Sequence, residues 1–123
     1  MTPLDQLGGE PVLQAILADL YTKLFADPMV GFLFVGRDQG HLVAMQTTFT
    51  RRLLGDGTAL YTGKSVPEAH AGLPILSGHF DRRHELLRQV LVAHDVPANV
   101  REHWLRLDQG LRTAVLHAGQ RKA

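Results

Sequence analysis

One histidine, His70, has the sequence setting of a candidate metal ligand. Ser65 and Glu68 have the spacing of a helix capping box, so a helix can begin just after Ser65, and Gly72 ends it about two turns later. A helix this short is marginal alone, because nucleation costs more free energy than so few hydrogen bonds return. A cofactor ligated by His70 would hold the helix, although packing alone could also do so.

Two polar side chains, Tyr21 and Gln46, interrupt apolar helical faces. Both lie at three- or four-residue spacing from apolar neighbours, which is the period of an amphipathic helix. A buried amide without partners costs about 1 to 3 kcal/mol, and a buried tyrosine hydroxyl also needs a partner. Gln46 is therefore either a tolerated residue at the core boundary or a donor directed into a pocket, with Tyr21 as its companion. The apolar residues on the face of Gln46 are Leu42, Met45, Phe49 and Leu53.

Glycine and proline divide the chain into helical segments. The expected helices cover residues 3–7, about 10–26, 39–54, 66–70, 78–94 and 99–118. Phe34 falls in a loop, where an aromatic residue is more often part of the core than a cofactor contact. No segment shows the alternating pattern of a strand, and the four long segments are separated by short breaks. These features predict an all-α fold.

The composition limits the possible functions. We expect one domain, 1–123, with a frayed tail at 119–123. A formal net charge of +1 gives no electrostatic reason to expect nucleic acid or an anionic membrane as a partner. The absence of cysteine excludes disulfides, thiolate metal sites and a cysteine nucleophile. The first residues lack the basic segment and apolar run typical of a leader peptide, and no apolar run approaches the length of about 20 residues needed to cross a bilayer. We therefore expect a cytoplasmic protein without a membrane partner.

The order and spacing of several motifs resemble those of group I truncated haemoglobins. In this family two pairs of antiparallel helices sandwich a haem, an arrangement called two-over-two. The resemblance covers nearly the whole chain. Its elements are Gly8-Gly9, Asp19-Leu20-Tyr21, Ala26-Asp27-Pro28, Phe34, Gln46 with Phe49, Gly55-Asp56-Gly57, Tyr61-Thr62-Gly63, Ala69-His70, His79-Phe80-Asp81 and Val96-Pro97.

The resemblance implies a haem b cofactor (iron protoporphyrin IX) and assigns roles around it. His70 matches the proximal histidine that ligates iron, and Phe34 matches the aromatic residue that packs on the haem. Tyr21 and Gln46 match the distal hydrogen-bonding residues, which would also be the catalytic residues of an enzyme. Further haem contacts are expected from Leu42, Met45, Phe49, Tyr61, Ile75, Phe80, Arg83 and Leu87.

The function implied by the resemblance is binding of O₂, NO or CO at a pentacoordinate or weakly hexacoordinate iron. Hydrogen-bond donors that already point at the position of bound O₂ slow its release, because bound O₂ carries partial negative charge and the hydrogen bonds are charge-assisted. NO dioxygenase or weak peroxidase activity is compatible with such a site, and the former needs an unidentified partner reductase. We expect a monomer or weak dimer. Two alternatives stay open: an electron-transfer or redox- and gas-sensing protein with six-coordinate iron, and a haem-free helical interaction module.

Three positions depart from the family pattern. Met45 stands where relatives often have a basic residue that pairs with a haem propionate, and its thioether could instead ligate ferrous iron. Arg83 replaces an apolar residue that faces the pocket, and it can be solvated, reach a propionate or approach the ligand. Thr50 replaces an aromatic residue that lines a ligand tunnel in some relatives. His79 is expected to tie its loop to the next helix, and His41 to lie at the surface or face a propionate. The remaining histidines expected at the surface are His84, His94, His103 and His117.

Overall fold

The computed structural model describes residues 1–55 and 65–120, and no strand occurs among them. This confirms the expected all-α fold. In chain order the elements are α1 (Pro3–Leu7), α2 (Glu10–Ala26), the 3-10 helix η1 (Gly31–Phe34), α3 (Gln39–Leu53), α4 (Val66–His70), α5 (Ser77–Ala93), α6 (Ala98–Gly110) and α7 (Arg112–Gln120).

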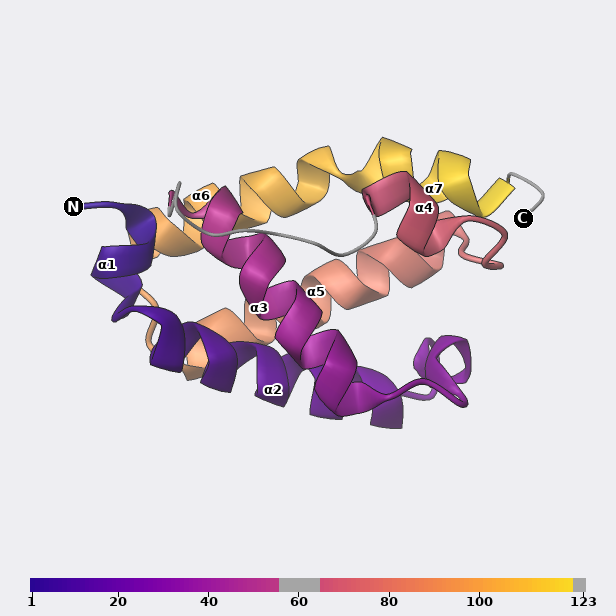
Figure 1. Cartoon of the computed structure of the whole chain (residues 1–123), viewed down its shortest axis with the longest axis horizontal. Coiled ribbons are helices and arrows are strands. Elements are labelled where there is room, and N and C mark those ends of the chain that lie inside the picture. The colour runs from indigo at the N-terminus through magenta and orange to yellow at the C-terminus, as the bar shows by residue number, and fades with distance from the viewer. Residues whose placement is uncertain (56–64, 121–123) are drawn as a thin grey trace.

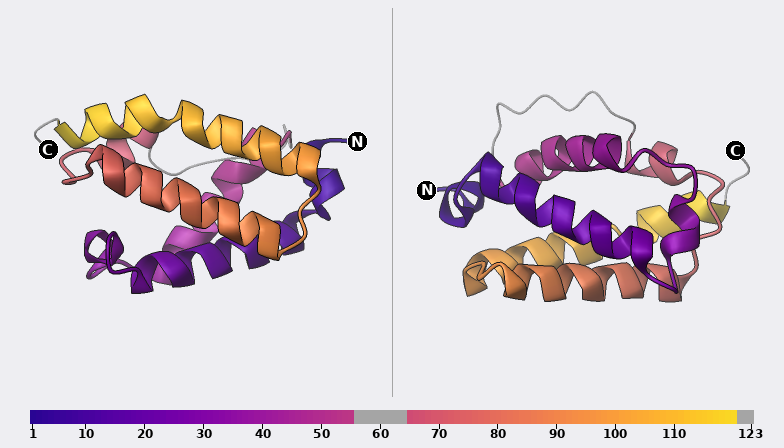
Figure 2. Two further views of the ribbon diagram at one scale, coloured as in Figure 1. Left: turned by 180° about the vertical axis from the view of Figure 1, so that it is seen from behind. Right: turned by 90° about the horizontal axis from the view of Figure 1, so that it is seen from below.

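Two layers of helices make up the molecule (Figures 1 and 2). Helix α2 packs on α3 in one layer, and α5 packs on α6 and α7 in the other. The layers meet mainly where α2 contacts α5, and the short helix α4 lies against α7. This is the expected two-over-two arrangement.

The core forms along the apolar stripes of α2 and α5. Their buried residues are Leu13, Ile16, Leu17, Leu20 and Leu24 on α2, and Phe80, Leu86, Leu87, Val90 and Leu91 on α5. Burial of each such side chain contributes about 1.5 to 3 kcal/mol, so these stripes fix α2 against α5. Tyr21 follows Leu20 and is half-buried, so the packed stripe places its ring at the border of the core.

The expected final helix is two helices, which corrects the sequence expectation. α6 ends at Gly110, and α7 begins at Arg112. At the break the N–H of Leu111 donates to the carbonyl of Asp108 at 3.0 Å, three residues back, in place of the α-helical bond to the fourth. Gly110 favours this break because glycine costs about 1 kcal/mol relative to alanine inside a helix. The apolar stripe continues across it, since Val115 is buried on α7.

Helix α7 continues through Gln120, so the described helix extends two residues into the segment 119–123 that was expected to fray. The buried residues Val115 and Ala118 hold its preceding turns against the core, which explains why the helix persists this far. Residues 121–123 lie outside the described residues. Within the described ranges, every helix is too short or too polar to cross a lipid bilayer.

Candidate functional site

A cavity of about 210 Å³ is lined by residues of both layers and, on one side, by residues of α4. Native interiors seldom keep voids larger than one water molecule, so a cavity of this size indicates a place for a ligand. Its walls are mostly apolar. The polar residues that line it are Tyr21, Arg37, Gln46, Thr50, His70, His79, Arg83 and Asp108.

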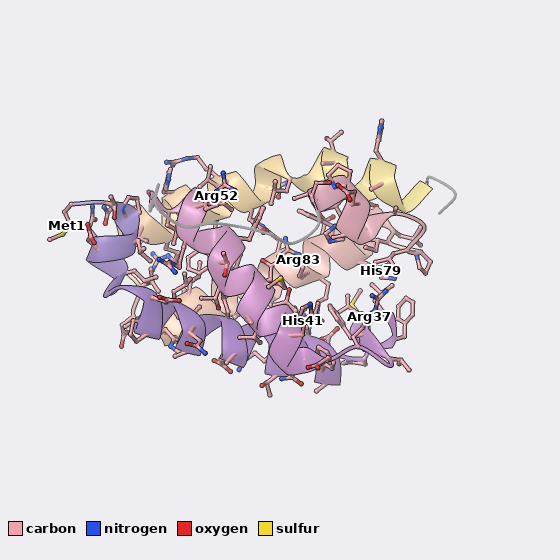
Figure 3. All side chains as sticks on the ribbon, viewed as in Figure 1. Met1, Arg37, His41, Arg52, His79 and Arg83 are labelled. Atoms are coloured by element: carbon pink, nitrogen blue, oxygen red, sulfur yellow. The ribbon has the colours of Figure 1, made fainter. Side chains whose placement is uncertain are left out.

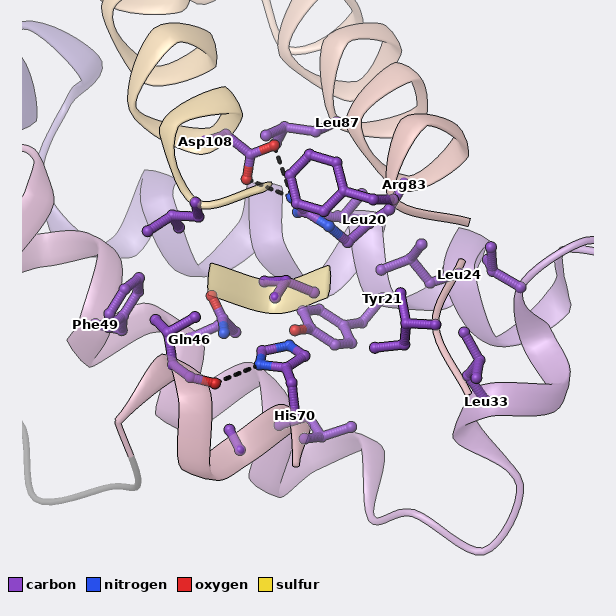
Figure 4. A pocket seen from close by; sticks show the side chains of 18 of the residues that line it. Leu20, Tyr21, Leu24, Leu33, Gln46, Phe49, His70, Arg83, Leu87 and Asp108 are labelled. Carbon is purple, nitrogen blue, oxygen red and sulfur yellow. Dashed lines mark hydrogen bonds and ion pairs between the residues drawn. The ribbon is translucent and has the colours of Figure 1, made fainter. Parts of the chain in front are cut away.

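His70 lines this cavity from the end of α4 (Figure 4). Its Nδ1 lies 2.7 Å from the carbonyl oxygen of Val66, one turn earlier in the helix. A carbonyl only accepts, so Nδ1 carries the proton and Nε2 keeps its lone pair. Burial lowers the pKa of His70 below its usual 6.5 against the opposing effect of the Val66 carbonyl, and the positive charge of Arg83 lowers it further. A neutral, oriented imidazole is the form that binds a metal.

The structure favours a metal brought by a cofactor over one held by side chains alone. Among the described residues, no group of three or more His, Cys, Asp or Glu side chains is placed to hold a metal ion. Protein-bound metal ions usually require three or four such ligands. A single imidazole in an apolar cavity instead fits a metal whose remaining ligands belong to a flat organic group.

Helix α4 is held by its cap and by α7. Ser65 caps it, because its Oγ accepts the N–H of Glu68 at 3.3 Å. Immediately after the helix, the N–H of Gly72 donates to the carbonyl of Ala118 on α7 at 3.2 Å. These contacts stabilise the short helix without a cofactor. Packing, the alternative to ligation in the sequence analysis, therefore accounts for part of the stability of α4.

Tyr21 and Gln46 enter the cavity from α2 and α3 (Figure 4). The Tyr21 ring meets Phe34 edge-on with ring centres 6.1 Å apart, and Phe34 stacks on Phe25 at 5.0 Å. Of these three rings, Tyr21 and Phe34 line the cavity, and the edge-on contact with Phe34 orients Tyr21. The structure thus brings the predicted donors and the predicted ligand His70 to one cavity.

Most of the other expected cofactor contacts also line the cavity: Phe34, Leu42, Phe49, Ile75, Phe80, Arg83 and Leu87. Met45 does not, although it was expected there. The lining residues of α3 centre on Gln46 and Phe49, and at about 100° per residue Met45 falls on the flank of that face. Tyr61, the remaining expected contact, lies outside the described residues.

Arg83 forms a partly buried ion pair that was not expected from the sequence. Its Nη2 lies 2.6 and 2.7 Å from the two carboxylate oxygens of Asp108 on α6, which is 6% exposed. His84 contacts the same carboxylate at 2.7 Å and is half-buried, which corrects its expected surface position. One signal was present in the sequence: Asp108 falls four residues after Trp104 and three before Leu111, inside an apolar stripe.

Two basic residues, Arg37 and His79, line the cavity at the end where η1 and the start of α5 lie (Figure 3). Arg37 is exposed there and was not singled out from the sequence. His79 accepts the N–H of Leu76 through Nδ1 at 3.0 Å, which confirms its expected role in tying the loop to α5. Its ring also lies 5.3 Å from that of Phe32, and its Nε2 is the nitrogen that carries the proton in the neutral form.

Comparison with known sequences gives one consistent result. A family model described as bacterial-like globin matches residues 2–117. A group 1 truncated haemoglobin from Tetrahymena pyriformis is 39% identical over 80 residues, which cover 65% of each chain. Another from Nostoc sp. (strain MUN 8820) is 26% identical over 120 residues, covering 94% of this chain and 98% of the relative.

Solved structures agree with this result over the whole fold. The truncated haemoglobin of Tetrahymena pyriformis in its Fe(III) form superposes with a TM-score of 0.86 and 32% identity, covering 94% of this chain and 97% of that one. The 2/2 haemoglobin of Synechococcus sp. PCC 7002, in the cyanomet state with covalently attached haem, gives a TM-score of 0.88 and 25% identity. Its alignment covers 95% of this chain and 99% of that one.

Proposed function

Because this chain belongs to the bacterial-like globin family and is a group I truncated haemoglobin, we propose that its cavity binds haem b and uses it to bind O₂. Haem-based binding of diatomic gases is the general property of these globins. The observation that carries the proposal is the single neutral imidazole of His70, whose Nε2 lone pair faces an apolar cavity that also receives Tyr21 and Gln46.

The cavity has the kinds of side chain that a haem requires: a ligand for the iron, apolar and aromatic residues for the ring, and basic residues for the carboxylates. His70 would ligate the iron, Phe34 and Phe80 would pack on the ring, and Arg37 with His79 would meet its carboxylates at the exposed end. Arg37 in this role would replace the basic residue that the chain lacks at Met45. When bound, the haem supplies an iron that takes O₂, NO or CO and, with an unidentified reductase, supports oxidation of NO to nitrate.

Tyr21 and Gln46 would act on the ligand by hydrogen bonding. A diatomic ligand that gains partial negative charge is retained by donors already placed in a water-poor cavity, because those donors need no reorganisation. The stacked rings of Phe34 and Phe25 hold Tyr21 in place for this role. Met45 does not line the cavity, which supports an open coordination position over ligation by its thioether.

The proposal is tested by titrating the purified protein with haemin and recording absorption spectra of the wild type and His70→Gly. We expect a sharp Soret band in the wild type that the variant lacks and that added imidazole restores. His41→Gly, which removes an exposed histidine on α3, is the matched control and is expected to behave as wild type. Identical spectra for wild type and His70→Gly would rule out ligation by His70.

A further inference from the structure

Arg83 places a permanent positive charge in the wall of a mostly apolar cavity. Its Nη2 contacts both carboxylate oxygens of Asp108, at 2.6 and 2.7 Å. Its guanidinium carbon lies 4.9 Å from the centre of the Phe80 ring, which supports the group from one face. These contacts hold the guanidinium at a fixed place on the wall between α5 and α6.

The carboxylate of Asp108 contacts a second side chain besides Arg83. Nδ1 of His84 lies 2.7 Å from Oδ2 of Asp108, so two basic side chains share one carboxylate. Figure 4 shows the guanidinium of Arg83 on the cavity side of that carboxylate. The ion pair therefore presents its positive end to the cavity.

Arg83 also keeps hydrogen-bond donors that Asp108 does not use. The contacts with Asp108 run through Nη2, whereas Nε and Nη1 together carry three further N–H groups. In the part of the chain that the structure describes, no buried side-chain nitrogen or oxygen lacks a partner. The N–H groups of Arg83 that do not contact Asp108 must therefore face the cavity or solvent, and 29% of the side chain is exposed.

We propose that Arg83 makes this cavity favour small anions over uncharged diatomic ligands. The inference rests on the proposed binding of haem, and the ligand class is the monovalent anion that binds ferric iron. A unit charge several ångströms from such an anion, at an effective dielectric constant of about 20, changes its affinity about tenfold or more. An uncharged ligand such as CO is affected far less by the same charge.

The test uses the haem-loaded protein and two probes, azide on the ferric form and CO on the ferrous form, both followed by absorption. We expect Arg83→Leu with Asp108→Asn to lower azide affinity about threefold to fivefold, because loss of the Asp108 charge offsets part of the loss of the Arg83 charge, while CO affinity changes less than twofold. Removing both charges avoids leaving a buried carboxylate unpaired, which could unfold the protein. Arg83→Leu alone is expected to lower azide affinity further, because the Asp108 charge then repels the anion.

Arg88→Leu is the matched control. Arg88 lies on the same helix and pairs with Glu85 at 2.7 Å, but its side chain is half-exposed and does not line the cavity. Arg88→Leu therefore removes one positive charge of the same kind from a position outside the cavity. We expect its azide affinity to stay within twofold of wild type. Equal azide affinity in wild type and the double variant would overturn the inference and leave haem binding by His70 intact.

A second outcome would also overturn it. If Arg83 holds a carboxylate of the haem itself, the double variant will release haem to apomyoglobin faster than wild type. Its ratio of azide to CO affinity will then be unchanged. Failure of the wild type to take up haem at all would instead refute the proposed function, and the haemin titration detects this before either probe is added.

Discussion

The Oγ of Ser65 accepts the N–H of Glu68 at 3.3 Å and lies 2.9 Å from Oε1 of the Glu68 side chain. The hydroxyl can therefore donate to the carboxylate while it caps the first turn of α4. This pair fixes the start of the helix that ends in His70. In a complete capping box the Glu68 side chain would accept the backbone N–H of Ser65. Here the Glu68 carboxylate instead contacts the Ser65 hydroxyl.

We predict that Ser65→Ala will speed the release of haem without changing its ligation. Loss of an N-cap costs about 1 kcal/mol, which corresponds to about a fivefold increase in the rate if the helix must open for release. Transfer of haem to apomyoglobin measures this rate. Ser77→Ala is the control, because Ser77 is exposed and makes no side-chain cap for α5. A Soret band shifted in Ser65→Ala would show that the cap affects the ligand itself.

We predict that Tyr21→Phe will release O₂ faster than wild type. The change removes the hydroxyl but keeps the ring that packs on Phe34 at 6.1 Å, so the cavity wall is preserved. A charge-assisted hydrogen bond of about 1.5 to 3 kcal/mol corresponds to roughly a tenfold to hundredfold change in the dissociation rate. Stopped-flow measurement of O₂ release tests this, with CO release as the comparison because CO gains less charge. An unchanged O₂ rate would exclude Tyr21 as a donor.

Most of the helices could be predicted from the sequence because their signals are local. The spacing of apolar residues on α2 and the cap of α4 are both properties of neighbouring positions, and both are confirmed. The division of α6 from α7 was missed because the apolar stripe runs unbroken across it. Only the conformation at Leu111, with its hydrogen bond to Asp108, marks the break.

The Arg83 ion pair could not be predicted from periodicity because its two residues are 25 positions apart on different helices. Asp108 could have been noticed as an acid inside an apolar stripe, but its partner depends on how α5 packs on α6. The position of Met45 has a similar cause: a helix face is a broad stripe in sequence, and tertiary packing decides which edge of it meets the cavity.

Gly31 occupies a position where a side chain does not fit. A Cβ at this residue would lie 2.8 Å from the backbone carbonyl oxygen of Phe25, which cannot move as a side chain can. We predict that Gly31→Ala lowers the free energy of unfolding by about 1 to 3 kcal/mol. Gly78→Ala is the control, since a Cβ there meets open space within α5 and should leave stability unchanged or raise it. Urea denaturation measures both, and equal midpoints would contradict the predicted clash.

Asp27 joins the end of α2 to α5. Its Oδ1 accepts from Nε and Nη2 of Arg82 at 3.1 and 2.8 Å, and its Oδ2 accepts the N–H groups of Met29 and Val30 at 2.9 and 3.1 Å. Its side chain is only 3% exposed. The hydrogen bond from Arg82, assisted by the two amides, lowers the pKa of Asp27 below its usual 3.8 against the opposing effect of burial.

We predict that Asp27→Asn lowers the free energy of unfolding by about 2 kcal/mol at pH 7, because it removes the charge that these donors stabilise. Since the folded pKa lies below the unfolded one, this contribution is full above the unfolded pKa of 3.8 and is lost as the pH falls through the folded value. The difference between the two proteins should therefore be constant from pH 7 to pH 5 and shrink below about pH 4. Asp81→Asn should cost less than about 1 kcal/mol, because that carboxylate is 59% exposed beside Arg112. Equal losses for the two variants in urea denaturation would show that the buried contacts of Asp27 add nothing beyond a surface ion pair.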